Sequence, residues 1–449
     1  MIIARLLKKS SLLIEYTSFC TCFFYWLLYS FVRIKGVPIF FGGAQVDSSL
    51  SGIVALVILL FNAIFFARLF LELATGENTL RAKLTTRLYG NLMPISLALF
   101  FIAFVTGGRF DYASYKLQWS LIIEGKNPWG LVEGGMVNAY GYVHNFFAVL
   151  YSANSLLPKL FFVLLLLFFC KRSIVAQSPR IKALVLFLCV NPFTISTIAV
   201  YGFIDGVCSL LLGLALLEIK YNSFRSAFKS GVYLAFSTLT KFYSIVALPL
   251  VLSACLRQRL VKGIASGYLL TSVVVIIISY ALWGDSILEP LAFAKGRDPS
   301  FLTLWKYVPH PELRTIIFSV ISIFAIIRAC TKYALSVSLR TAAVLSIVFG
   351  SYYLGHQQFY LGILVALTVY IVEVFRDSDT LLGSPLLRSF ALMFGWLVFI
   401  QTGFELFDEF KPVGFQNLLP ILSFLNSMIL VTLGCFWLST KSTLEQRNA

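Results

Sequence analysis

The chain has 449 residues, of which 59% are hydrophobic and only 12% charged. A soluble domain is excluded, because an aqueous surface could not carry the 43 Phe and 21 Tyr residues of this chain. The formal net charge is +16. A membrane protein with its positive charge on one side explains that value without a nucleic-acid partner.

Apolar runs of about 17–25 residues, the length of a membrane-spanning helix, recur along the chain. They are too long and unbroken for the alternating pattern of a membrane barrel. We therefore predict an all-α polytopic membrane protein, a bundle of about 12–14 transmembrane helices. The expected spans are 12–32, 51–70, 88–106, 157–170, 183–200, 204–218, 230–240, 242–255, 263–283, 315–330, 337–350, 357–374, 386–402 and 417–438.

Basic residues indicate which loops share a side of the membrane. If the N-terminus is inside, the inner segments contain 24 of the 36 basic and eight of the 20 acidic residues, so the whole net charge falls on the inner side. The large polar loops 107–158, 284–314 and 404–416 then lie outside. We expect the functional site on this extracytoplasmic face. A bacterial inner or plasma membrane is favoured, because the chain has no Asn-x-Ser/Thr sequon.

Asp111 is the first candidate for chemistry. It follows the expected span 88–106 closely, and an acid at that depth is costly unless it faces water or a partner. A salt bridge to Arg109 is the structural alternative.

The first large outer loop is expected to contain an amphipathic helix from Asp111 to about Ile123, lying at the membrane surface. Gly125 and the Asn127-Pro128 pair would end it, because the residue before proline disfavours helix. The apolar and aromatic residues on which this helix is predicted recur every three or four positions, at Tyr112, Tyr115, Trp119 and Ile122.

Polar aromatic residues of the same loop suggest a sugar site. Tyr140 and His144 lie in its second half, and together with Tyr115 they could bind hydroxyls and stack on a sugar ring. The alternative explanation for the aromatics is an interfacial belt.

Two later segments place charges at the same outer depth. Asp205, in the turn YGFIDG, would begin a helix, where it could cap that helix or join Asp111 in binding a metal or an acceptor hydroxyl. Lys241 lies between two half-helices of the apolar stretch 230–256. There it must reach the interface or pair with an anion, and a phosphate is the natural anion.

Two outer loops add weaker candidates. Arg297, in EPLAFAKGRDPSF, would favour a phosphate head group at the lipid boundary, with a solvated loop as the alternative. His356, in SYYLGHQQFY, lies between two spans, and a structural hydrogen bond competes with a ligand role.

The order of these features resembles the GT-C superfamily of membrane glycosyltransferases. An acid after a span is followed by EGKNPW, then NP and YGFIDG, then LTKFYSIVALPL, an Arg-bearing outer loop and SYYLGHQQFY. The nearest likeness is to the mannosyltransferase-like members that use polyprenyl-phosphate sugars. It covers a core at 88–374 with outer loops 107–158 and 284–314, leaving two extra helices in 1–87 and C-terminal helices in 375–449.

The resemblance implies a polyprenyl-phosphate sugar donor and transfer to a glycan or lipid-linked acceptor. Asp111 matches the acid expected as general base or acceptor-positioning carboxylate, and Lys241 and Arg297 match the basic residues at the donor phosphate. Asp205 and His356 match weaker positions. Position 109 is Arg and position 113 is Ala, so an Asp-x-Asp pair is missing. No cofactor is therefore assigned, and a divalent metal ion stays open.

The chemistry of glycosyl transfer supports the same pair of residues, since it needs a base near the hydroxyl and positive charge on the leaving phosphate. A single candidate carboxylate favours inversion. Two alternatives stay open: a polysaccharide polymerase or ligase acting on lipid-linked glycans, and a lipid-linked oligosaccharide flippase or transporter. The expected partners are the donor, the acceptor and membrane lipids, with no nucleic acid.

Overall fold

The computed structural model is all-helical throughout the part of the chain that it describes. The expected first span 12–32, and the candidate residues Arg109 and Arg297, lie outside the described residues. The described ranges are 48–77, 79–108, 111–129, 140–175, 177–257, 260–291, 299–300, 302–307, 311–352, 355–377, 385–410 and 418–440.

Each expected span from residue 51 onward corresponds to a helix or to a pair of shorter helices. Breaks occur where the sequence indicates them, at Asn191-Pro192 and at Lys241. The main elements of the bundle are α2 (Ser48–Thr75), α4 (Leu92–Thr106), α8 (Leu157–Ser173), α9 (Pro179–Cys189), the short π-helix η1 (Ile195–Val200), α11 (Ile204–Ile219), α12 (Phe224–Thr240), α13 (Ala247–Arg257), α14 (Val261–Trp283), α16 (Pro311–Thr331), α17 (Val337–Ser351), α18 (Leu361–Asp377), α19 (Pro385–Phe410) and α20 (Leu419–Ser439).

The number of helices that could cross a membrane unaided is smaller than expected. Within the described residues four helices are long and apolar enough, or up to eight if each bent pair forms one span. The expected 12–14 spans exceed this number because several helices are short: α11, α12 and α17 have 16, 17 and 15 residues, against about 20 for an upright span. The structure therefore shows a helical protein with several apolar, membrane-type helices.

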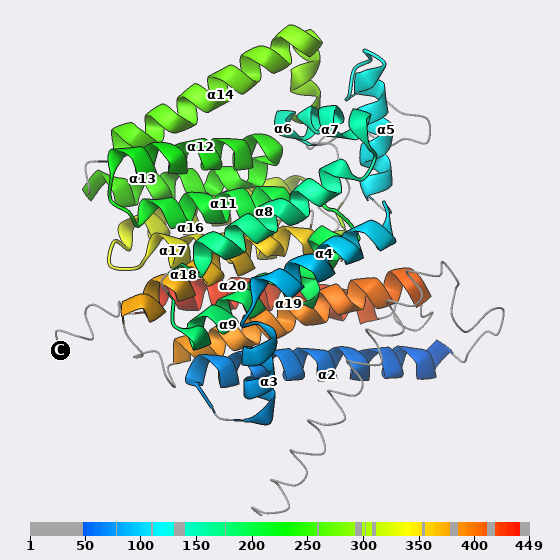
Figure 1. Cartoon of the computed structure of the whole chain (residues 1–449), viewed down its shortest axis with the longest axis vertical. Coiled ribbons are helices and arrows are strands. Elements are labelled where there is room, and N and C mark those ends of the chain that lie inside the picture. The colour runs from blue at the N-terminus through cyan, green and yellow to red at the C-terminus, as the bar shows by residue number, and fades with distance from the viewer. Residues whose placement is uncertain are drawn as a thin grey trace, which may run out of the picture.

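The long helices lie side by side, from α14 at one edge to α2 at the other, so that their ends gather at two ends of the bundle (Figure 1). Helix α18 is central and almost entirely buried, whereas α14 and α16 are peripheral and mostly exposed. Close backbone approach joins α14 to α12, because a Cβ on Gly231 would lie 2.2 Å from the Ile264 carbonyl oxygen. Small residues permit this kind of packing between membrane helices.

Two of the loops expected on the outer side, 107–158 and 284–314, lie at one end of the bundle, together with the Lys241 break. The Gly141 N–H donates to the Thr240 carbonyl at 3.0 Å, and Asn127 Nδ2 donates to Ser286 Oγ at 3.0 Å. Near the same end, Trp305 Nε1 donates to a backbone carbonyl of α17 at 2.6 Å. The short helices α5 (Asp111–Ile123), α6 (Tyr142–Phe146) and α7 (Ala148–Ala153) lie at this end, and α5 runs across the direction of the long helices (Figure 1).

Candidate functional site

Helix α5 confirms the expected helix at residues 111–123. It is bent by 74° from α4, and Gly125, with φ of +74°, follows its last turn. Tyr112, Tyr115 and Trp119 share one face, and all three are completely buried. This aromatic face packs within the protein, and the position of the helix relative to the membrane surface stays a prediction.

Helices α6 and α7 cover that face of α5, which explains the burial. Trp119 Nε1 donates to the His144 carbonyl at 3.0 Å, and the Tyr112 hydroxyl donates to the Ser155 carbonyl at 2.8 Å. The chain then turns by 118° into α8. Helices α5 to α7 therefore form a platform of aromatic rings, packed mostly edge-to-face, that holds Asp111 at the start of α5.

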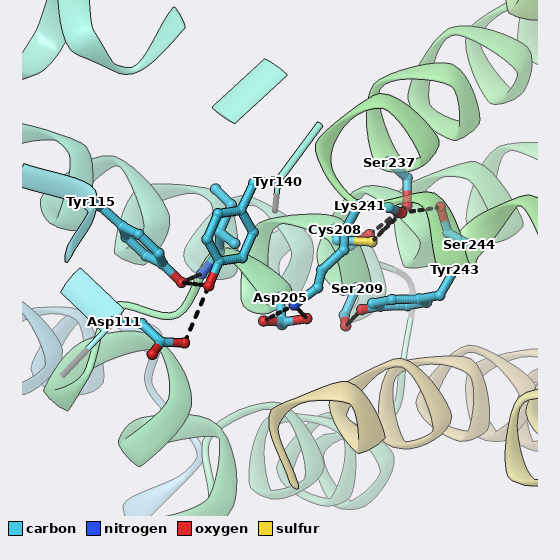
Figure 2. Close-up of polar contacts among 11 residues, drawn as sticks. Asp111, Tyr115, Tyr140, Asp205, Cys208, Ser209, Ser237, Lys241, Tyr243 and Ser244 are labelled. Atoms are coloured by element: carbon cyan, nitrogen blue, oxygen red, sulfur yellow. Dashed lines mark hydrogen bonds and ion pairs between the residues drawn. The ribbon is translucent and has the colours of Figure 1, made fainter. Parts of the chain in front are cut away.

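Asp111 is half-buried and accepts a hydrogen bond from a tyrosine. The Tyr140 hydroxyl donates to Asp111 Oδ2 at 3.3 Å, and the Tyr115 hydroxyl donates to the Tyr140 oxygen at 3.4 Å. The N–H of Ile204, at the start of α11, donates to the Tyr115 hydroxyl at 3.4 Å. Figure 2 shows this chain of contacts, which joins the α5 carboxylate to the segment that carries Asp205.

Lys241 and Asp205 form an ion pair between the end of α12 and the start of α11 (Figure 2). Lys241 is extended, with φ of −154°, and its Nζ lies 2.7 Å from Asp205 Oδ1 and 2.9 Å from Oδ2. The carboxylate is completely buried, whereas the lysine side chain is 17% exposed. Asp205 lies in the first turn of α11, as expected for an acid at a helix start, and its carboxylate also pairs with Lys241. Its role at a metal or an acceptor hydroxyl stays a prediction.

Two aromatic rings enclose the Lys241 ammonium. Its Nζ lies 4.3 Å from the centre of the Phe359 ring and 5.0 Å from that of Tyr140. Both distances suit a cation–π contact. Tyr140 therefore contacts Asp111 through its hydroxyl and Lys241 through its ring, and the two principal candidates lie on either side of one tyrosine.

His356 is connected to the Lys241 ion pair through Phe359. It immediately precedes the short helix η5 (Gln357–Tyr360), and its ring lies 5.3 Å from the Phe359 ring in an edge-to-face contact. Ser300 Oγ donates to the Gly355 carbonyl at 2.9 Å, so the second outer loop is tied to the same place. Arg297 belongs to that loop and stays a prediction.

His144 and Tyr115 lie behind the site surface. Both are completely buried, so neither side chain presents a surface to a sugar in this structure, and their sugar-binding role stays a prediction. The His144 ring stacks on Trp119, with centroids 5.3 Å apart, and burial lowers the pKa of His144 to about 3. A neutral, stacked imidazole supports Tyr115 and Tyr140 from beneath.

Residues that the sequence did not single out surround the ion pair. The Phe359 ring lies over the Lys241 ammonium, and the Tyr243 hydroxyl forms a hydrogen bond with Ser209 Oγ at 3.2 Å. Cys208 Sγ lies 3.6 Å from the Lys241 carbonyl oxygen. Phe359 and Tyr243 belong to the motifs SYYLGHQQFY and LTKFYSIVALPL, and this was the only feature of the sequence that could have pointed to them as site residues.

The arrangement offers a half-buried carboxylate and a partly exposed cation at one end of a helix bundle. The lysine ammonium has three N–H donors, and Asp205 Oδ2 accepts one of them, while Oδ1 lies at ion-pair distance. The ammonium therefore has donor capacity for a further acceptor such as a phosphate oxygen. Among the described residues no group of three His, Cys, Asp or Glu side chains could hold a metal ion.

Comparison with known proteins adds no family. Neither a family model nor a curated protein matches this chain. The resemblance to GT-C enzymes therefore stays a prediction from motifs, and the function has to be argued from the site itself.

Proposed function

We propose that the protein is an integral-membrane glycosyltransferase of the GT-C type. It moves a sugar, with a mannose-like hexose favoured, from a polyprenyl-phosphate donor to an acceptor hydroxyl at the extracytoplasmic face. The observation that supports this most is the placement of Asp111 and Lys241 on the two sides of Tyr140. A base and a cation on the two sides of one tyrosine suit the acceptor hydroxyl and the leaving phosphate of a glycosyl transfer.

In this mechanism the acceptor oxygen attacks the anomeric carbon while the bond from that carbon to the phosphate oxygen breaks. Asp111 takes the proton of the acceptor hydroxyl, and the electron pair of the broken bond goes to the phosphate. Lys241 stabilises that developing charge with an N–H that Asp205 does not use. Since a single displacement is involved, the anomeric configuration inverts.

Asp205 orients the cation in this proposal. Its buried carboxylate holds Nζ in place and offsets part of the lysine charge. A second cation is therefore needed at the donor phosphate, and Arg297 is the candidate.

The test is sugar transfer by the purified protein in lipid nanodiscs, with a radiolabelled polyprenyl-phosphate mannose as donor. Asp111→Asn should reduce turnover by about 10²–10⁴-fold, the usual contribution of a general base. Lys241→Met should also reduce it, whereas Lys126→Met, which removes an exposed cation of the same loop, should not. Wild-type turnover in Asp111→Asn would refute the assignment of the base.

A transporter of lipid-linked glycans is the second candidate, because a buried ion pair at a helix break, here Lys241 with Asp205, is also typical of transport pathways. Sealed proteoliposomes separate the two functions. A transferase yields a new glycosidic bond, one sugar per turnover, while a transporter moves an unchanged donor across the bilayer. Joined repeat units as the product would instead indicate a polymerase or ligase.

A further inference from the structure

A completely buried lysine lies beside the site and has no part in the mechanism above. Lys159 is the third residue of α8 and has no exposed surface. Its Nζ donates to Thr106 Oγ1 at 2.7 Å, to the Gly107 carbonyl at 2.5 Å and to the Val200 carbonyl at 2.7 Å. The three N–H donors of an ammonium are thus matched by three oxygens.

The position of these oxygens explains how a buried cation is stabilised. The N-terminus of α8 itself disfavours positive charge, because the helix dipole is positive there. The acceptors, however, belong to the C-terminal ends of α4 and of the π-helix η1, where backbone carbonyls have no partner within the helix. Lys159 therefore caps two helices other than its own.

Both capped ends lead directly into the candidate site. Gly107 precedes Asp111 by four residues, and Val200 precedes Asp205 by five. Lys159 also contacts helix α5, since its backbone N–H donates to the Tyr112 hydroxyl at 3.3 Å. A Cβ on Gly202 would lie 3.2 Å from the lysine Cγ.

We propose that Lys159 is a positioning residue: by fastening the end of α4 to the end of η1 it sets the separation between Asp111 and the Asp205–Lys241 ion pair. The ammonium holds the two segments at their last helical residues, so neither can shift without breaking a charge-assisted hydrogen bond. The relevance of this separation to catalysis rests on the proposed glycosyltransferase function, whereas the fastening of the two helix ends by Lys159 is independent of it.

Hydrogen–deuterium exchange of the full-length protein in nanodiscs tests the fastening without any substrate. Lys159→Met keeps most of the apolar stem and removes the ammonium. Exchange of the segments 107–115 and 200–206 should then rise together by about tenfold or more, since hydrogen bonds to a charged group are lost from both. In the sugar-transfer assay, turnover should fall in parallel.

Arg340→Met is the matched control, because Arg340 is also buried and donates to Ser253 Oγ and to the Ala329 carbonyl, outside the site. It should leave exchange at 107–115 and 200–206 unchanged. If Lys159→Met leaves both segments as protected as in the wild type, or raises exchange equally along the whole chain, the positioning role is overturned.

Thr106→Val is a milder variant that decides the matter if Lys159→Met does not fold. It removes one of the three acceptors, and exchange should rise in both segments by a smaller factor. Unchanged exchange in either segment would overturn the proposal. If the wild-type protein transfers no sugar but the variants show these exchange changes, the proposed function is refuted and the fastening by Lys159 still stands.

Discussion

Lys241 donates to Asp205 Oδ2 at 2.9 Å and its Nζ lies 2.7 Å from Oδ1, and the lysine is partly exposed while the carboxylate is completely buried. The pair joins the end of α12 to the start of α11, two helices in extensive contact. The cation therefore stands at the surface of the site with its counterion behind it. This asymmetry decides what removal of either partner does.

Removal of the Lys241 charge should destabilise the protein strongly, because it leaves the Asp205 carboxylate buried and uncompensated. Lys241→Met should lower the free energy of unfolding by about 3 kcal/mol, the usual cost of breaking a buried ion pair. Adding Asp205→Asn to that variant should recover much of the loss. Equilibrium unfolding in detergent micelles measures both changes.

Lys126→Met is the control for that cycle. Lys126 and Glu124 also pair, at 2.7 Å, but their side chains are 62% and 52% exposed. Water screens such a pair, so the change should stay within about 0.5 kcal/mol. A similarly small effect of Lys241→Met would contradict the buried ion pair.

Tyr140→Phe should separate the two contacts of this tyrosine. It removes the hydroxyl that donates to Asp111 but keeps the ring beside Lys241. Stability should change by about 1 kcal/mol or less, while sugar transfer should fall about tenfold, the equivalent of one lost hydrogen bond to a carboxylate. Tyr140→Leu also loses the cation–π contact and should be less stable still. Equal transfer rates for Tyr140→Phe and the wild type would show that the hydroxyl does not orient Asp111.

The helices and the position of Asp111 could be predicted from the sequence because their causes are local. Apolar run length, Gly125 and the Asn127-Pro128 pair act within a few residues, and α5 begins and ends where they indicate. The grouping of the outer loops also followed from counting basic residues.

The contacts across the bundle could not be predicted in the same way. Asp205 is 36 residues from Lys241, and only the packing of α11 on α12 brings them together. His144 looked like a surface ligand because the packing of α6 and α7 over α5 leaves no local pattern. Lys159 could not be distinguished in the sequence from the other basic residues assigned to the outer side, because its acceptors come from two helix ends that are distant in the sequence.

Stability should depend on pH through His144, which α6 holds at the end of the bundle. Burial lowers its pKa to about 3, whereas an unfolded histidine titrates near 6.5. The unfolded state therefore binds the proton first, so this group leaves stability intact above about pH 6.5 and reduces it as the pH falls from there towards 3. His144→Phe should flatten that part of the profile, measured as unfolding midpoints between pH 7 and 4. An unchanged slope would contradict the buried, neutral imidazole.

Gly202→Ala should disturb the segment that carries Asp205. Gly202 has φ of +65°, and a Cβ there would lie 2.9 Å from Tyr112 Cδ2. The left-handed backbone costs about 1–2 kcal/mol for alanine, and the steric overlap adds about 1–3 kcal/mol.

Gly125→Ala isolates the backbone part of that cost, because φ is +74° but no atom lies within 4 Å of the added carbon. Unfolding of the two variants should therefore differ by the steric part alone. Because Gly202 packs between Tyr112 and Lys159, its variant should also slow sugar transfer, while Gly125→Ala should not. Equal losses of stability in both variants would mean that the Gly202 turn has room for a side chain, and the close packing of the two site segments around Lys159 would be wrong.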